Sequence, residues 1–452
     1  MKKAHYWLIS GVVLLVICGI SGAWAYSSWT KESAAYQYTS LAIKAIGDGD
    51  YDEAIEYLTK ALEANPDYAP AYYNLGIAYG NEDQFHRYYK LPGQTFTEAG
   101  YPEMQDKYEK AVYYYTLLET KFPEYKPIAE MGLGDVNFLY YCGYVNREKH
   151  VLPHYLYALE HIDVVEKHLG KEGVSALYTN LARTYLAMAK VEEARSYYLK
   201  AISVYPDPGI DTAYEHLAWV ELELGNITGA YQVAQDFIQR AEKYGWDKDL
   251  GLMPASISAY LLGKYDEAME YAKEITEKHP DSAYVGEAYR TMALIYHLKG
   301  DDANAVKMLE KDISNCLNAI KNPEDATTIP TAKYEMALAY YLLAKLTDNQ
   351  TALTKSIENL EWIINNPDQT KREVAHRNYY ILAHLSLASI YTEKQLYSQA
   401  LSTLQSLKNT LQADPDMKGW KDLIGNLVDN LIQKASKSQA IEMPELTWIL
   451  SH

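Results

Sequence analysis

The densest group of side chains that could bind a metal ion or transfer a proton is a histidine series, His150, His154, His161 and His168. His150 and His154 have the spacing at which two imidazoles on one helical turn chelate an ion, but Pro153 disfavours a continuous helix there. The last three recur every seventh residue and share one helical face. They would lie about 10 Å apart along the helix axis, too far apart for one ion. We therefore expect solvated surface histidines, no metal site and no cofactor.

Other chemistry-bearing motifs are missing from the sequence. It contains no glycine-rich phosphate loop, no GxSxG, no HExxH and no kinase-like set of motifs. Its three cysteines, Cys18, Cys142 and Cys316, form no CxxC and no Cys/His ligand spacing. This excludes zinc fingers, c-type haem attachment and thioredoxin-like motifs. The pattern predicts a protein that is not an enzyme, with no catalytic residues.

Composition restricts the partners and the shape of the core. The net charge of −18 at neutral pH repels phosphate backbones, and no run of Lys and Arg offsets it, so we expect no nucleic-acid binding. The hydrophobic fraction of 48% allows a folded core. There are 44 Tyr and only 5 Phe. Tyr packs its ring and keeps its hydroxyl near water, which suits a thin protein whose buried residues lie close to the surface.

The N-terminus has the pattern of a membrane anchor. Lys2 and Lys3 precede an apolar stretch, residues 6–26, with Tyr and Trp near both ends. Its length is close to the roughly 20 residues that span a bilayer as a helix. The positive-inside rule places the two lysines in the cytoplasm. We predict a signal anchor over residues 1–30, with the rest of the chain outside the cytoplasm.

Two other fates of the N-terminus remain open. The motif AWA at 23–25 is a possible signal-peptidase site, and cleavage near Ala25 would give a secreted protein. The motif LVIC at 15–18 is similar to a lipobox, but Ile17 stands where a small residue is expected. All three fates place residues 31–452 outside the cytoplasm. Sequons at Asn226 and Asn349 are compatible with that location.

Small residues, glycine and proline recur in phase along the chain. Pairs of alanines twelve residues apart flank turns that often contain glycine, as at Gly49, Gly225 and Gly300. A separate spacing of twelve links an alanine to a following proline, at Ala54 and Pro66, Ala111 and Pro123, Ala194 and Pro206, and Ala268 and Pro280. Alanine at both positions lets two helices approach closely. Glycine provides a left-handed C-terminal cap, and proline ends a helix. The alanine pairs are Ala42 and Ala54, Ala182 and Ala194, Ala218 and Ala230, Ala293 and Ala305, and Ala388 and Ala400.

This pattern resembles the tetratricopeptide repeat. AYYNLGIAY at 71–79 and LYTNLARTY at 177–185 are similar to its first helix, and YDEAIEYLTKALEANP at 51–66 is similar to its second. The resemblance implies an all-α, right-handed α-solenoid of about nine helix pairs over residues 31–416. A capping helix over 417–438 and an apolar tail over 439–452 would follow. Insertions at 81–104 and 142–152 would loop out from one edge.

The resemblance also implies a partner-binding surface. In this family the first helix of each pair lines a concave groove. The units that offer the most apolar lining carry Met253, Ile257, Tyr260, Arg290, Leu294, His297, Tyr334, Leu338 and Tyr341. The last unit offers Leu385, Ser389, Thr392 and Glu393. The Lys/Arg/Asn clamp for carboxylate-ended peptides is not visible, so we expect an apolar or aromatic peptide or protein partner. Alternatively, these side chains pack between repeats.

These observations predict a non-enzymatic interaction scaffold on the outer side of the membrane. The first alternative is an accessory or assembly subunit of an envelope machine, such as a pilus, secretion or surface-layer system. A third class is an enzyme or metal-binding protein with its site in the insertions. The apolar tail suggests one ligand within the chain, since Trp448, Ile449 and Leu450 are unfavourable in water. They would dock on the solenoid end or in a groove, in the same or a neighbouring molecule; the oligomeric state stays open.

Overall fold

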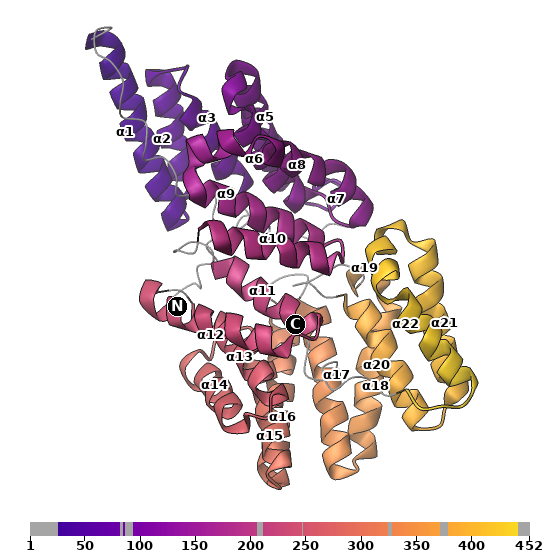
Figure 1. The fold of residues 1–452 in the computed structure, drawn as a ribbon. Coiled ribbons are helices and arrows are strands. Elements are labelled where there is room, and N and C mark those ends of the chain that lie inside the picture. Colours follow the sequence, from indigo (N-terminus) through magenta and orange to yellow (C-terminus); the bar gives the residue numbers. More distant parts are fainter. Residues whose placement is uncertain are drawn as a thin grey trace. The chain divides into compact units, whose positions relative to one another are not determined.

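The regular structure of the described residues is helical, with no strand among them. They form two compact units: an N-terminal unit that runs to Thr184 and includes 196–213, and a C-terminal unit of 185–195 and 214 onward. This confirms the predicted fold class, an all-α repeat solenoid. The computed structural model describes residues 26–81, 85, 94–205, 211–245, 247–323, 328–370 and 378–441 (Figure 1).

In the N-terminal unit, consecutive helices pack in pairs, and the first helices of successive pairs also touch. α1 packs on α2, α3 on α5, and α6 on α8, while α3 contacts both α1 and α6. Each pair therefore buries its apolar face against its neighbours, as a repeat array requires. The helices are α1 (Tyr26–Asp48), α2 (Tyr51–Ala64), α3 (Ala69–Gly80), α5 (Pro102–Lys121), η1 (Pro123–Tyr125), α6 (Lys126–Tyr140), α7 (Tyr144–His150), α8 (Leu152–Glu160), and most of α9 (Ile162–Leu186) and α10 (Val191–Val204).

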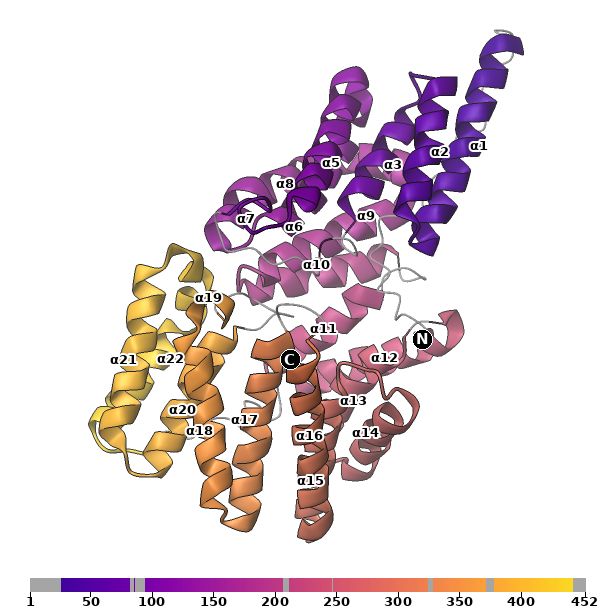
Figure 2. The same cartoon turned by 180° about the vertical axis from the view of Figure 1, so that it is seen from behind.

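The C-terminal unit repeats the arrangement. α13, α15, α17 and α20 contact one another in succession, and each packs on the helix that follows it. Figures 1 and 2 show α17, α18, α20, α21 and α22 side by side from opposite directions. The helices are α11 (Asp211–Glu223), α12 (Ile227–Tyr244), α13 (Asp249–Leu261), α14 (Tyr265–Lys278), α15 (Val285–Leu298), α16 (Asp302–Lys321), α17 (Thr328–Thr347), α18 (Gln350–Asn365), α19 (Pro367–Thr370), α20 (Tyr379–Glu393), α21 (Tyr397–Ala413), η2 (Pro415–Met417) and α22 (Lys418–Ser436).

The phased small residues have the roles that their spacing predicts. Gly49, Gly225 and Gly300 adopt φ values of 78°, 75° and 77°, the left-handed conformation that ends a helix. The paired alanines lie at helix contacts, where their exposure is at most 1%. These alanines are Ala42, Ala54, Ala182, Ala194, Ala218, Ala230, Ala293, Ala305, Ala388 and Ala400.

Side-chain caps start several second helices. Asp50 accepts a hydrogen bond from the Glu53 N–H at α2, and Asp301 accepts one from Asn304 at α16. Both sequon asparagines do the same, because Asn226 caps α12 and Asn349 caps α18. The local signal in each case is Asp or Asn before the helix.

The two predicted insertions differ in structure. Phe96 in the first is buried and packs on the ring of Tyr140 at 5.5 Å, before α5 begins. The second, residues 142–152, is largely helical: it contains α7 and buries Tyr144 and Val151. Gly143, whose φ is 87°, turns the chain directly before α7. The expected outward loop at 142–152 is thus a short helix with its own apolar anchors.

The two ends of the chain lie largely outside the described residues. The predicted anchor, residues 6–26, is described only at Tyr26, the first residue of α1. Within the described ranges, no helix combines the length and the apolar character that a membrane crossing requires. Of the apolar tail, residues 439–441 are described, and Trp448, Ile449 and Leu450 are not.

Candidate functional site

The predicted groove residues on α13 lie inside the helical layers. Met253 and Ile257 are fully buried, and Tyr260 is 5% exposed. Almost the whole of α13 is buried in this way, because α12, α14 and α15 pack around it. In this structure these three side chains contribute to the core, which is the alternative stated for them above. Their contact with a partner stays a prediction.

The predicted residues on α15 differ in exposure along the helix. Arg290 is fully buried, Leu294 is half-buried, and His297 is exposed at the end of the helix. The His297 Nδ1 lies 2.6 Å from the Asp302 carboxylate at the start of α16. Of these three, only Leu294 and His297 offer surface to a partner.

Arg290 is the centre of a buried ionic cluster that the sequence analysis did not anticipate. Its guanidinium donates a hydrogen bond to Asp312 at 2.8 Å and lies 3.9 Å from both Glu287 and Glu335. Burial raises the pKa of the Asp312 carboxyl to about 7, although Arg290 opposes the shift. Burial also raises the pKa of the Cys316 thiol, which donates to Asp312 at 3.6 Å. The cluster joins α15, α16 and α17, and each of its residues is at most 6% exposed.

The predicted residues on α17 face α20. Tyr334 and Leu338 are fully buried, and Tyr341 is 9% exposed. The Tyr341 hydroxyl donates to the Glu393 carboxylate of α20 at 2.9 Å, and Lys345 pairs with the same carboxylate. Burial and the Glu393 charge both raise the pKa of Tyr341, so the hydroxyl stays a donor. Tyr341, Lys345 and Glu393 therefore form a polar edge where α17 meets α20.

A piece of chain outside regular secondary structure lies against α20. After α22, the backbone N–H of Ile441 donates to Thr392 Oγ1 at 3.0 Å, and its carbonyl accepts from Ser389 Oγ at 3.0 Å. The Ile441 side chain is 3% exposed and belongs to the buried apolar cluster of α20, α21 and α22. Ser389 and Thr392 are two of the four lining positions that the resemblance assigns to the last unit. We call Ser389, Thr392 and the apolar contact of Ile441 the tail site.

The polar contacts of the tail site are made to the main chain of Ile441. Both backbone groups of one residue are paired with hydroxyls, and its side chain fills an apolar position. Peptide recognition by extended-chain capture uses the same two components. Sequence reasoning placed the docking residues at 448–450. It overlooked Ile441, the first large apolar residue after the polar run SKSQ at 436–439.

The histidine series does not converge on one point. His154 Nδ1 lies 2.6 Å from the Glu130 carboxylate, and the rings of His150 and His161 stack on Tyr141 and Tyr157. His168 packs on Tyr125 with ring centroids 4.4 Å apart. Burial lowers the pKa of His150 and of His168. Each ring thus has its own aromatic or acidic neighbour. The expectation that His154, His161 and His168 share one helical face is wrong, because α8 ends at Glu160, before His161, and His168 lies on the next helix, α9.

Comparison with known proteins identifies the repeat. Models of the tetratricopeptide repeat match residues 45–85, 175–208 and 255–282. Three segments of the chain therefore match the tetratricopeptide repeat. The three matched segments coincide with α2 and α3, with the end of α9 and α10, and with α13 and α14. The first two matches include the segments 51–66, 71–79 and 177–185, on which the resemblance was stated. A search of curated proteins finds no match.

Solved structures with similar folds are distant in sequence. Pseudomonas aeruginosa PilF is 18% identical, covers 56% of this chain and 95% of its own, with a TM-score of 0.40. A Rap protein complexed with competence and sporulation factor is 14% identical and covers 90% and 100%, with a TM-score of 0.44. Yeast Tom70 is 13% identical and covers 91% of each chain, with a TM-score of 0.41.

Proposed function

We propose that this protein is a non-enzymatic scaffold that captures an extended peptide segment of a partner at the tail site. The observation that carries the proposal is the double pairing of the Ile441 backbone by Ser389 and Thr392. It supports a site that accepts an extended segment with an apolar side chain. The apolar positions of α17 and α20 around it favour apolar or aromatic neighbours in the ligand.

The location that fits this function is the outer side of a membrane. Lys2 and Lys3 before the apolar stretch at 6–26 support an uncleaved anchor with the repeats outside the cytoplasm. Cleavage near Ala25 would leave the same repeats secreted. Either form presents the tail site to extracytoplasmic partners.

A peptide in trans tests the tail site directly. A chain shortened to end at Gln439 lacks Ile441, so its tail site is empty. A fluorescent peptide of residues 439–452 can then be added as a separate ligand of known sequence. We expect the peptide to bind the shortened chain saturably in fluorescence anisotropy. The full-length chain should bind it much more weakly, because its own Ile441 occupies the site.

Substitutions that remove the Ser389 and Thr392 hydroxyls test their role in binding. The pair Ser389→Ala with Thr392→Val in the shortened chain should abolish saturable binding, since it removes the acceptor and the donor for the peptide backbone. Ser406→Ala on the exposed side of α21 is the control and should bind like the parent. If the peptide fails to bind the shortened chain, or binds the double variant as well as the parent, the tail site is not a peptide-binding site.

A further inference from the structure

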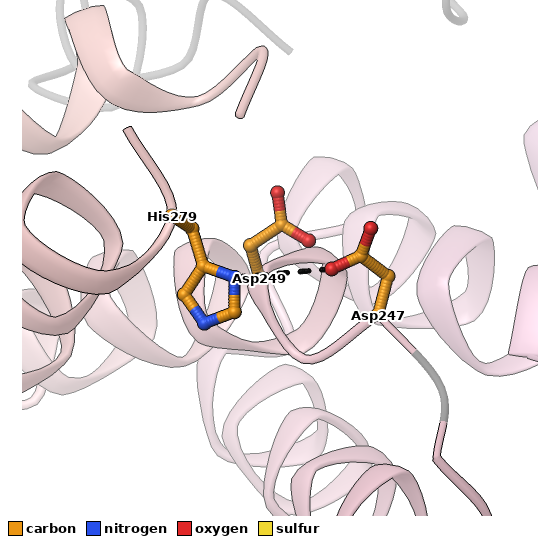
Figure 3. A group of neighbouring side chains, drawn as sticks. All are labelled: Asp247, Asp249 and His279. Carbon is orange, nitrogen blue, oxygen red and sulfur yellow. Dashed lines mark ion pairs between the residues drawn. The ribbon is translucent and has the colours of Figure 1, made fainter. Parts of the chain in front are cut away.

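Three side chains outside the proposed peptide site could bind a metal ion. Asp247 lies on the connection from α12 to α13, Asp249 is the first residue of α13, and His279 follows the last residue of α14 (Figure 3). One ligand atom from each lies within 4.8 Å of the other two, and His279 Nδ1 lies 3.9 Å from Asp247 Oδ1. Two metal–ligand bonds of about 2.1 Å span at most about 4.2 Å. Small rotations of the two carboxylates are therefore enough to bring all three groups onto one ion.

The buried carboxylate of Asp249 points to a ligand. Asp249 is 6% exposed, and its Oδ1 has no hydrogen-bond partner in the part of the chain that the structure describes. A buried carboxylate oxygen in that state is costly unless a cation or a proton compensates it. The cluster thus contains one buried carboxylate oxygen that a bound cation would stabilise.

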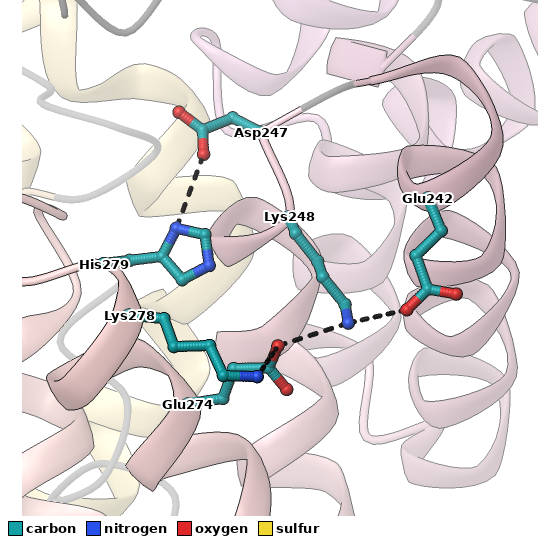
Figure 4. Close-up of polar contacts among 6 residues, drawn as sticks. All are labelled: Glu242, Asp247, Lys248, Glu274, Lys278 and His279. Atoms are coloured by element: carbon teal, nitrogen blue, oxygen red, sulfur yellow. Dashed lines mark hydrogen bonds and ion pairs between the residues drawn. The ribbon is translucent and has the colours of Figure 1, made fainter.

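Lys248, which lies between the two aspartates in the sequence, forms its ion pairs with other acids. Lys248 Nζ lies 2.7 Å from Glu242 and 3.3 Å from Glu274, and Lys278 pairs with Glu274 at 3.1 Å. Figure 4 shows the Lys248 side chain running away from Asp247 toward these two glutamates. The lysine next to Asp247 and Asp249 in sequence therefore forms its ion pairs away from them.

The three groups are held by regular structure. Asp249 is the first residue of α13, and the Lys248 carbonyl accepts hydrogen bonds from Gly251 and Leu252 as that helix begins. The His279 N–H donates to Ile275 at 2.9 Å, and its carbonyl accepts from Ser282. The side chains of His279 and Asp247 are 26% and 38% exposed, so an ion can enter and keep water ligands.

We propose that Asp247, Asp249 and His279 bind one divalent first-row transition metal ion, for which Zn²⁺ is the probe. One imidazole nitrogen with two carboxylate oxygens suits such ions, whereas Ca²⁺ and Mg²⁺ prefer oxygen ligands alone. The bound ion would join the start of α13 to the end of α14. Binding to the folded state only would then stabilise this helix pair.

Calorimetric titration of the purified full-length protein, without a polyhistidine tag and after chelator treatment, tests the site. We expect one Zn²⁺ per chain, and Ca²⁺ should bind at least about tenfold more weakly, as expected for a nitrogen-containing site. Asp247→Asn and His279→Gln should each weaken Zn²⁺ binding at least about tenfold, since even outer-shell changes have effects of that size. The rise in Tm that Zn²⁺ produces should disappear in both.

His297→Gln is the matched control, because this exposed imidazole has one carboxylate neighbour, Asp302. It should bind Zn²⁺ like the parent. Circular dichroism of the metal-free variants checks that each folds. The site is excluded if the parent shows no saturable binding of one Zn²⁺. It is also excluded if folded Asp247→Asn and His279→Gln bind as tightly as the parent, or if His297→Gln abolishes the binding.

Discussion

At the scale of single residues, the strongest departure from the sequence-based prediction is Arg290. Its place in the helical period assigned it to a groove lining, and periodicity identifies a face without identifying what covers that face. The acids that pair with it come from three helices: Glu287 on its own helix, Asp312 on α16 and Glu335 on α17. A single sequence does not show that these distant acids converge. The charged side chain of Arg290 was therefore predicted to lie on a partner-binding surface.

Replacing Arg290 with Met tests the buried cluster. The substitution keeps the length of the side chain but leaves Asp312 and Glu335 buried without their cation. Loss of one partner from a buried ion pair typically costs about 3–5 kcal/mol. We expect a loss of that order in the free energy of unfolding, measured by urea titration.

Lys60→Met is the control for Arg290→Met. Lys60 pairs with Glu56 at 2.6 Å on the exposed face of α2, so we expect little change in stability. Equal unfolding midpoints for Arg290→Met and the parent would show that the cluster is not charged in the folded protein.

At the scale of helices, most of the fold was predictable, because each repeat contains local sequence signals for helix starts, helix ends and helix contacts. Capping Asp and Asn, left-handed glycines and contact alanines mark where each helix starts, ends and crosses its neighbour. α7 was not predicted, since residues 142–152 stand outside the repeat period. The cluster of Asp247, Asp249 and His279 was missed for a related reason. Its members are brought together by the antiparallel packing of α13 and α14 and follow no local motif.

Glycines inside helices set how closely three helices approach. The Tyr115 ring of α5 is buried between Gly76 of α3 and Gly132 of α6. A Cβ on Gly132 would lie 2.2 Å from a ring carbon of Tyr115, and one on Gly76 would lie 2.4 Å away. These contacts are too short for any side chain, so both positions require glycine while Tyr115 stays in place.

Gly132→Ala should therefore overpack the contact of α5 with α6 and destabilise the protein by about 1–3 kcal/mol. Gly425→Ala is a matched substitution within α22, where a Cβ would meet only Lys421 Cγ at 3.9 Å. There alanine should be neutral, or stabilising by about 0.5–1 kcal/mol, through its higher helix propensity. Thermal melts of both variants decide the matter. A Gly132→Ala protein at least as stable as Gly425→Ala would contradict the packing argument.

At the scale of the whole molecule, the location of the chain rests on residues 1–30 alone. The net charge of −18 and the repeats suit either side of a membrane, so neither contributes to the assignment. The partner is likewise not encoded in the fold, because the repeat provides a surface whose specificity depends on a few side chains.

Protease accessibility tests the predicted topology. Added to intact right-side-out vesicles, trypsin should digest the repeats, because the positive-inside rule places Lys2 and Lys3 on the opposite side. Inverted vesicles should protect the same region, and a cytoplasmic marker protein serves as the control. Protection in right-side-out vesicles with digestion in inverted ones would reverse the assignment.

The connection from α22 to Ile441 is short, and this affects how readily another ligand can replace Ile441. Only four residues, 437–440, link the end of the helix to the tail site. Short tethers give effective concentrations in the millimolar range. A free peptide with the same intrinsic affinity as the tail would have to reach millimolar concentrations before it displaced the tail from half of the molecules. Under the proposed function, a partner that displaces the tail at lower concentrations must make additional contacts, and the tail would then exclude weak, sequence-independent ligands.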